Sequence, residues 1–411
     1  MSGSPSRDVS RSMIPRWVHA GIAALALAAS CSTRNAALER ALPRAIESGA
    51  RTEPPAHDYF VIVASEAVDQ IAVIRFGAAG ASVERTTTTG IMPSDVDGPH
   101  SVAVSPDGRW YYVSTAHGTP YGFLWKYALA NDSLAGRVML GNFPATTQIT
   151  PDGAFAYVVN YNVYGEMVPS SVSIVSTDEM VEVARVPTCT MPHGSRINAQ
   201  GTRQYSACMM DDLAVEIDTR TFGVARYFDV AKGRERGFAG AIPKGAADAH
   251  DMSAHADATP RRQVSCSPTW AQPSANGSTI YVACNKSNDI VEIDAASWTM
   301  RRRIPAGDGV YNLAVTHDGR LLVATNKRGQ SVSLFDAGTG AELARIPTTR
   351  RVVHGIAISA DDRYGFVSQE GIGAEPGAVD VVDLRARRRV ASVDVGQQAG
   401  GIDFWRMSPS P

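Results

Sequence analysis

Hydrophobic and polar positions alternate in short runs along most of the chain, and these runs recur in a fixed order. An apolar run such as SVAVSPDG or LAVTHDG ends in a tight turn, and a second run such as WYYVS or IYVACN follows it. After a polar loop comes a third run that ends in an acid, as in VSIVSTD, IVEIDA and AVDVVDL. Runs rich in Val, Ile, Tyr and Phe between turn residues are typical of buried β-strands. The pattern therefore predicts an all-β fold.

The tight turns mark an internal repeat. Successive turns are spaced by about 42 to 48 residues, apart from one step of about 76, and a period of ~40–50 residues is typical of a four-stranded propeller blade. Most of the turns read Asp-Gly or a close variant, because glycine adopts the positive φ of a tight turn at no steric cost. The residues that end the six turns are Gly108, Gly153, Gly201, Gly277, Gly319 and Asp362.

The two ends of the chain supply one further module. Tyr59–Phe76 has the second and third strands but no first strand, whereas Gly400–Trp405 has a first strand but no second. Pairing the two ends would close the ring and leave no open sheet edge. We therefore expect a seven-bladed β-propeller of four-stranded antiparallel blades over residues 58–407, closed by pairing of the N- and C-terminal strands.

The repeat resembles that of the YVTN-repeat, or YncE-like, bacterial propellers, a WD40-like architecture. The segments that carry the resemblance are GPHSVAVSPDGRWYYVS, FAYVVN and IYVACNKSNDIVEIDA, and it extends over about residues 59 to 405. Relatives with this architecture include nitrous oxide reductase, dissimilatory nitrite reductase and propeller lactonases. Their chemistries differ entirely, so the resemblance implies a fold and leaves the reaction open.

Residues 1–31 have the features of a secretory signal. Arg7, Arg11 and Arg16 precede the apolar run AGIAALALAAS, which is too short to span a membrane. The stretch LAASC resembles a bacterial lipobox, in which Cys31 would carry the lipid. We expect a protein on the periplasmic side of the envelope, held to the membrane only by that lipid, with residues 32–57 as a tether. Simple secretion is the alternative.

The charge balance argues against nucleic acid as a partner. The chain has 39 basic and 41 acidic residues spread along its length, for a formal net charge of −2. Binding to nucleic acid normally requires a strong excess of positive charge on one surface. We expect a monomer that binds a small ligand or an envelope protein.

Four further cysteines occupy equivalent places in two neighbouring modules. Cys189 and Cys266 precede the first strand, whereas Cys208 and Cys284 end the second strand. Antiparallel pairing makes these two places neighbours, so disulfides Cys189–Cys208 and Cys266–Cys284 are expected in an oxidising compartment. A soft-metal site that also uses the nearby methionines is the competing interpretation. Those methionines are Met191, Met209 and Met210.

Three histidines align at one position of the repeat. His100, His193 and His354 each stand at the start of a first strand, around the expected mouth of the central channel. They are candidates to contact a ligand or to share a copper or zinc ion. The competing interpretation is that each histidine only hydrogen-bonds neighbouring backbone. Other candidates for shaping a pocket there are Arg196, Trp270 and Tyr311.

The long step between the fourth and fifth modules contains an insertion at about residues 231–263. It carries His250 and His255, which we count as further ligand-binding candidates. Interblade connections lie on the same side as the aligned histidines, so the insertion is expected to form a lid or side wall there. A surface loop without a binding role is the alternative.

The sequence contains none of the motifs GxSxG, HExxH, a Walker loop or CxxCH. The interpretation that follows is a non-catalytic propeller that binds a ligand or protein on the face carrying the irregular loops. The alternative is a histidine-centred, metal-dependent oxidoreductase resembling nitrous oxide reductase, or a lactonase-type hydrolase. Whether the protein is an enzyme, and what its catalytic residues would be, stays open at this stage.

Overall fold

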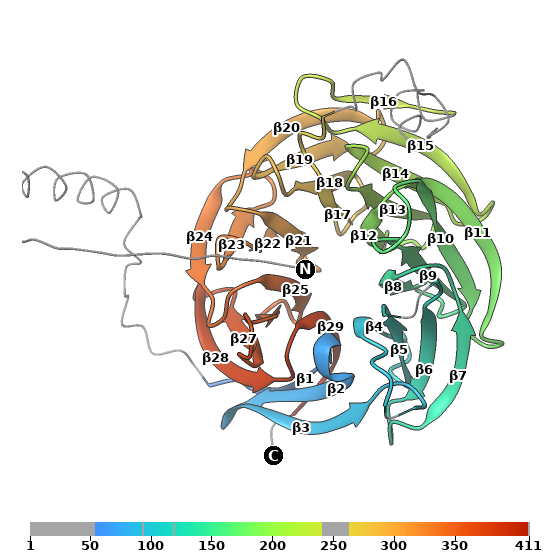
Figure 1. Ribbon diagram of the computed structural model, residues 1–411. Coiled ribbons are helices and arrows are strands. Elements are labelled where there is room, and N and C mark those ends of the chain that lie inside the picture. The colour runs from blue at the N-terminus through green and yellow to red at the C-terminus, as the bar shows by residue number, and fades with distance from the viewer. Residues whose placement is uncertain (1–53, 93, 118–119, 241–262, 410–411) are drawn as a thin grey trace, which may run out of the picture. The chain divides into compact units, whose positions relative to one another are not determined.

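The computed structural model describes residues 54–92, 94–117, 120–240 and 263–409. These residues form seven antiparallel sheets arranged around a central channel, so the expected seven-bladed propeller is confirmed (Figure 1). The first strand of each blade lines the channel and the fourth lies at the rim. Within the described residues, no helix has the length and apolar character needed to cross a membrane.

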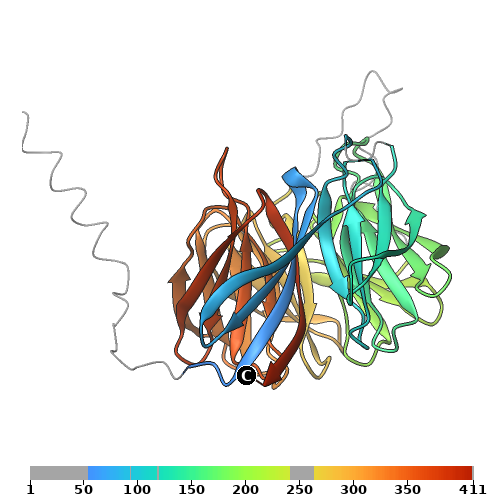
Figure 2. The same ribbon diagram turned by 90° about the horizontal axis from the view of Figure 1, so that it is seen from below.

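Blade 1 joins the two ends of the described chain. Its C-terminal strand β29 pairs with β1 from His57↔Pro409 to Ser65↔Ala399, and the two lie side by side in Figure 2. This pairing is the closure that the terminal half-modules predict. The blade consists of β29 (Ala399–Pro409), β1 (His57–Ser65), β2 (Gln70–Gly77) and β3 (Gly80–Thr88), with the short helix η2 (Glu66–Val68) between β1 and β2.

Blades 2 to 4 follow in chain order. Blade 2 has β4 (Pro99–Val104), β5 (Trp110–Thr115), β6 (Phe123–Ala128) and β7 (Leu134–Met139). Blade 3 has β8 (Pro144–Ile149), β9 (Phe155–Asn160), β10 (Pro169–Ser176) and β11 (Val181–Thr190). Blade 4 has five strands: β12 (Pro192–Ile197), β13 (Arg203–Cys208), β14 (Leu213–Asp218), β15 (Gly223–Asp229) and β16 (Arg236–Phe238).

Blades 5 to 7 complete the ring. Blade 5 has β17 (Pro268–Pro273), β18 (Thr279–Cys284), β19 (Asp289–Asp294) and β20 (Thr299–Pro305). Blade 6 has β21 (Val310–Val315), β22 (Leu321–Asn326), β23 (Ser331–Asp336) and β24 (Glu342–Pro347). Blade 7 has β25 (Val353–Ile358), β26 (Tyr364–Gln369), β27 (Gly377–Asp383) and β28 (Arg388–Val395).

The hydrophobic core lies between the blades. One buried cluster, for example, joins Val61 and Ile74 of blade 1 to Phe366 and Val379 of blade 7. The second and third strands of each blade pack against neighbouring blades on both faces. Their sequences are therefore nearly continuous apolar runs. The core therefore holds the blades together and leaves their two loop-bearing ends free to carry a site.

The repeated turn between first and second strands is held by its own side chains. In the turn that ends at Gly108, the Ser105 hydroxyl donates to Asp107 Oδ1 at 2.6 Å, and the backbone amide of Arg109 donates to the same carboxylate. Gly108 has a φ of 67°. The motif of Ser or Thr, then Asp, then Gly thus builds a rigid turn, and all such turns lie on one face, which we call the turn face. The opposite face is called the loop face.

Candidate functional site

Each blade presents the second residue of its first strand at the loop-face mouth of the channel. The residue two positions earlier has a positive φ in every blade, from 47° at Ser267 to 65° at Gly309. The chain therefore enters all seven first strands in the same way. The residues at the mouth, in blade order, are Gly400, His100, Ala145, His193, Thr269, Tyr311 and His354.

The structure brings the three aligned histidines together, with Tyr311 among them. The ring centroid of His100 lies 5.5 Å from that of His354 and 6.2 Å from that of His193. Tyr311 stands beside both of the other histidines, with centroid distances of 5.4 Å to His193 and 4.9 Å to His354. We call these four residues the histidine cluster. Its fourth member, Tyr311, stands at the same position of the repeat as the three histidines, but an alignment of the histidines alone does not include it.

Hydrogen bonds fix the proton positions of one cluster member. His193 Nδ1 lies 3.1 Å from the carbonyl oxygen of Thr269, and its Nε2 lies 3.0 Å from the Tyr311 hydroxyl. A carbonyl oxygen can only accept, so Nδ1 carries the proton and Nε2 accepts one from the phenol. The competing sequence interpretation, in which a histidine bonds neighbouring backbone, thus describes part of what His193 does.

Burial keeps this part of the cluster uncharged. It lowers the pKa of His193 to about 3, and the nearby His100 acts in the same direction. The pKa of His354 also lies well below its ordinary value, because of burial first and of Lys327 second. Burial raises the pKa of Tyr311 well above 10. At neutral pH the imidazoles of His193 and His354 are therefore neutral and the phenol of Tyr311 is protonated.

His100 is tied instead to an acid from the neighbouring blade. Glu66, in the short helix η2 of blade 1, accepts a hydrogen bond at 2.6 Å from His100 Nδ1 and one at 2.8 Å from His117 Nε2. Burial alone would raise the pKa of Glu66, but His100 and His117 outweigh it and lower that pKa to about 2. The hydrogen bond to Glu66 in turn raises the pKa of His117. Glu66 thus links blade 1 to blade 2 at the channel mouth.

Arg196 and Trp270 lie deeper in the channel, where they help to line a small cavity of about 40 Å³ below the histidine cluster. The Arg196 guanidinium stacks over the Trp270 ring, 4.4 Å from its centroid. Asp403 lines the same cavity, and burial raises its pKa. A cavity of this size holds a few water molecules at most. These two predicted residues therefore shape the channel and do not reach the loop-face surface.

A metal ion needs several ligand atoms directed at one point. Across the described part of the chain, no three His, Cys, Asp or Glu side chains come together in this way. His193 engages both ring nitrogens with protein partners, and His100 engages its Nδ1 with Glu66. Copper or zinc on these histidines stays a prediction from the sequence.

Both expected disulfides are present. Cys189 and Cys208 have a Cα–Cα distance of 5.9 Å, and Cys266 and Cys284 one of 4.5 Å. The second bond lies where the register pairs Pro268 with Cys284, so the first-strand entrance and the second-strand end are neighbours, as antiparallel pairing predicts. The sulfur atoms are bonded to one another, which removes the soft-metal interpretation for the cysteines.

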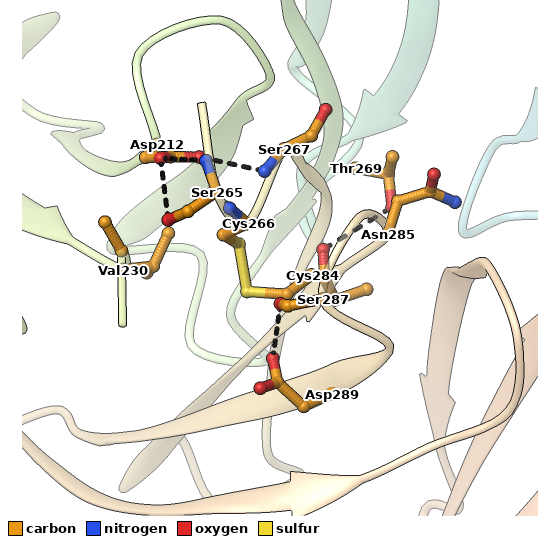
Figure 3. Close-up of a disulfide and its surroundings, with 12 residues drawn as sticks. Asp212, Val230, Ser265, Cys266, Ser267, Thr269, Cys284, Asn285, Ser287 and Asp289 are labelled. Atoms are coloured by element: carbon orange, nitrogen blue, oxygen red, sulfur yellow. Dashed lines mark hydrogen bonds between the residues drawn. A yellow bond between two sulfur atoms is a disulfide. The ribbon is translucent and has the colours of Figure 1, made fainter. Parts of the chain in front are cut away.

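The Cys266–Cys284 disulfide is supported by a buried acid of the preceding blade (Figure 3). Asp212 accepts hydrogen bonds of 2.8 to 3.0 Å from the backbone amides of Ser265, Cys266 and Ser267. A carboxylate that accepts several backbone amides fixes the conformation of the segment that donates them. This contact and the disulfide hold the entrance to blade 5 in place beside the channel mouth.

A larger pocket opens on the loop face above Tyr311 and Thr269. We call it the loop-face pocket; its volume is about 730 Å³. Its walls combine two phenols, three apolar or sulfur-containing side chains and three cations. These are, respectively, Tyr161 and Tyr311; Met209, Val352 and Ile372; and Lys327, Arg328 and Arg351.

The described part of the insertion lies elsewhere than expected. Arg236–Phe238 forms strand β16, which pairs with β15 and extends the outer edge of blade 4 (Figure 1). It is held there because Phe238 stacks on Tyr227 at 5.4 Å and Gly237 packs against Trp298. This part is therefore not a wall over the histidines. His250 and His255 lie outside the described residues, as do Cys31 and the segment up to residue 53.

Glu66 and Arg351 are two of the site residues that the sequence patterns did not single out, and Val352 and Ile372 of the loop-face pocket are two others. For Glu66 and Arg351 the sequence did contain a signal. Glu66 directly follows β1, at the place where other blades carry polar residues after their second strands, and Arg351 directly precedes the entrance to blade 7. Both lie in irregular segments whose side-chain directions do not follow from strand periodicity.

No protein-family model matches the chain, and none of the curated proteins matches it. Solved structures with the same fold include hydrazine synthase of Kuenenia stuttgartiensis, with a TM-score of 0.56 and 19% identity over 75% of this chain and 90% of that one. Another is a functionally unknown protein from Desulfotomaculum acetoxidans, with a TM-score of 0.63 and 15% identity over 85% of this chain and 99% of that one. At these identities the likeness shows the propeller fold alone.

Proposed function

We propose that this chain is a periplasmic propeller of the YVTN-repeat type that binds a small molecule in its loop-face pocket and does not catalyse a reaction. The observation that carries the proposal is the pocket itself. Its volume of about 730 Å³ falls within the ~300–1,000 Å³ of small-molecule sites, which usually combine apolar and aromatic walls with a few polar groups. The floor is rigid, because Tyr311 is hydrogen-bonded to buried His193.

The electrostatics of the histidine cluster favour binding over acid–base chemistry. A general acid or base works best with a pKa near the operating pH. The pKa of His193 is lowered to about 3 by burial, whereas that of Tyr311 is raised well above 10 by burial. These groups are suited to donate and accept fixed hydrogen bonds. No specific observation favours the oxidoreductase or lactonase alternatives.

The proposed location rests on the N-terminal sequence and on the disulfides. Residues 1–31 have the order of a secretory signal with a lipobox-like end at Cys31. Two disulfides are expected of a protein that folds in an oxidising compartment. We therefore place the propeller on the periplasmic side of the envelope, tethered by a lipid on Cys31.

The test blocks the pocket with a bulky side chain. Ile372 lines the pocket and is 48% exposed, so Ile372→Trp should fill space there without disturbing the core. Val181, equally exposed on the rim strand β11, provides the matched control Val181→Trp. A metabolite library is screened by thermal shift, and the affinity of each hit is measured by calorimetry. We expect Ile372→Trp to weaken binding at least ~10-fold and Val181→Trp to leave it unchanged. If Val181→Trp weakens binding and Ile372→Trp does not, the loop-face pocket is not the binding site.

A further inference from the structure

The cations of the loop-face pocket are not balanced by acids. None of the residues that line the pocket is acidic, whereas Lys327, Arg328 and Arg351 are basic. The carboxylates paired with these cations are Glu370, at 2.7 Å from Lys327, and Asp308, at 3.1 Å from Arg328. Three positive charges against two negative ones leave a net positive charge at the pocket.

Two of the three cations are already held by protein groups. The Lys327 ammonium bonds to Glu370 and lies 4.3 Å from the centroid of the Tyr311 ring. The Arg328 guanidinium bonds to Asn285, Asn288 and Asp308. Such fixed cations set the electrostatic field of the pocket, but they have few N–H groups left to offer a ligand.

Arg351 differs from the other two cations. It is exposed at the pocket wall, and within the described residues its guanidinium has no hydrogen-bond or ion-pair partner. A guanidinium presents five N–H donors in a planar fork that matches a carboxylate or phosphate group. Arg351 therefore has the full capacity to bind an anionic group that enters the pocket.

The backbone conformation of the next residue, Val352, brings Arg351 to the pocket wall. Val352 lines the pocket and has a φ of 62°, and it is the sole β-branched residue among the described non-glycine residues with positive φ. Left-handed backbone is unfavourable for β-branched residues, but the equivalent residue has a positive φ in every blade, so the conformation belongs to the entrance of each first strand. At this position the chain turns into β25 so that Arg351 and Val352 both face the pocket.

We propose that the ligand is a small organic anion, whose carboxylate or phosphate group binds Arg351 and whose apolar body packs between Tyr161, Tyr311 and Ile372. This inference rests on the proposed function and deepens it. The pocket is far larger than an inorganic ion requires, and its phenol and aliphatic walls suit a planar or aliphatic carbon skeleton. A neutral molecule of the same shape would leave the positive charge of the pocket without a partner.

The test compares acids with their uncharged analogues. The probes are benzoate with benzamide, hexanoate with hexanamide, and phenyl phosphate, each titrated into the full-length mature protein at low and high salt. The variants are Arg351→Glu and the conservative Arg351→Lys. Arg320→Glu is the control, because Arg320 is exposed in a tight turn on the turn face.

We expect at least one acid to bind at least ~10-fold more tightly than its amide, with an affinity that falls as salt is added. Arg351→Glu should abolish this preference, Arg351→Lys should keep part of it, and Arg320→Glu should leave it unchanged. Tighter binding of phenyl phosphate than of either carboxylate would assign the anionic group as a phosphate.

Two outcomes would overturn the proposal. One is equal affinity for acids and amides, and the other is an anion affinity that Arg351→Glu does not change. If Ile372→Trp still blocks a neutral ligand in either case, the loop-face pocket remains a binding site and only the ligand class is wrong. If Ile372→Trp blocks nothing that binds, the pocket assignment itself fails.

Discussion

Replacing Glu66 by Gln should destabilise the propeller strongly, because Glu66 links blades 1 and 2. The Glu66 carboxylate is buried and accepts hydrogen bonds from His100 and His117. A glutamine has the same shape but no charge, and its amide nitrogen cannot accept a hydrogen bond. The variant therefore loses at least one charge-assisted bond across the blade interface.

The size of the effect follows from the pKa of Glu66. That pKa is lowered from 4.5 to about 2, and each unit corresponds to about 1.4 kcal/mol. Glu66→Gln should therefore reduce the free energy of unfolding by about 3 kcal/mol near pH 5.5. The control is Glu84→Gln, since Glu84 is 40% exposed and 3.7 Å from Arg75; exposed pairs of this kind contribute about 0–1 kcal/mol.

The difference in the free energy of unfolding between wild type and Glu66→Gln should depend on pH, and this dependence is a more specific test than its size. The lowered pKa of Glu66 contributes stability above pH 4.5, and this contribution is lost as the pH falls towards about 2. The raised pKa of His117 contributes stability that is fully present below pH 6.5 and is lost as the pH rises through the raised value. The free energies of unfolding of wild type and Glu66→Gln should therefore differ most between pH 4.5 and 6.5.

Urea unfolding followed by tryptophan fluorescence at several pH values measures the difference. A difference that stays constant from acid to alkaline pH would refute the electrostatic reasoning. A Glu66→Gln variant as stable as Glu84→Gln would refute the role of Glu66 as a link between blades.

Three further predictions concern the disulfides, a buried acid and the membrane anchor. The two disulfides close loops of 19 and 18 residues, worth about 3 kcal/mol each in the chain-entropy model; thiol titration of the unfolded, non-reduced mature protein should detect no free thiol among these four cysteines. Asp212→Ala leaves three backbone amides without their acceptor and should cost about 3 kcal/mol in urea unfolding, whereas a loss below about 1 kcal/mol would show that water replaces the carboxylate. Cys31→Ala should move the protein from the detergent phase to the soluble periplasmic fraction, and equal partitioning of both forms would exclude lipidation.

The repeat made most of the fold predictable. The tight turns and apolar runs are local features, and each is dictated by side chains a few residues apart, such as Ser105, Asp107 and Gly108. The closure of the ring by β29 and β1 could also be predicted, because one terminal module lacked the strand that the other supplied. Equivalent cysteine positions in two modules predicted the disulfides for the same reason.

The site was only partly predictable, because repeat alignment places residues on the backbone and does not give their contacts. Alignment grouped His100, His193 and His354, but Tyr311, at the same position, belongs to the group as well. Strand β16 has three residues and is stabilised by stacking on Tyr227 of the neighbouring strand, so no local pattern marks it. Arg351 gains its importance because its guanidinium has no ion-pair partner among the described residues, which only the folded arrangement reveals.

The central claim is that the loop-face pocket binds a small molecule, and a crystal structure of the protein purified from its native host without dialysis tests it most directly. We predict electron density for a small molecule between Tyr161 and Tyr311, with an acidic group in contact with Arg351. An empty loop-face pocket together with a bound molecule on the turn face would contradict the account.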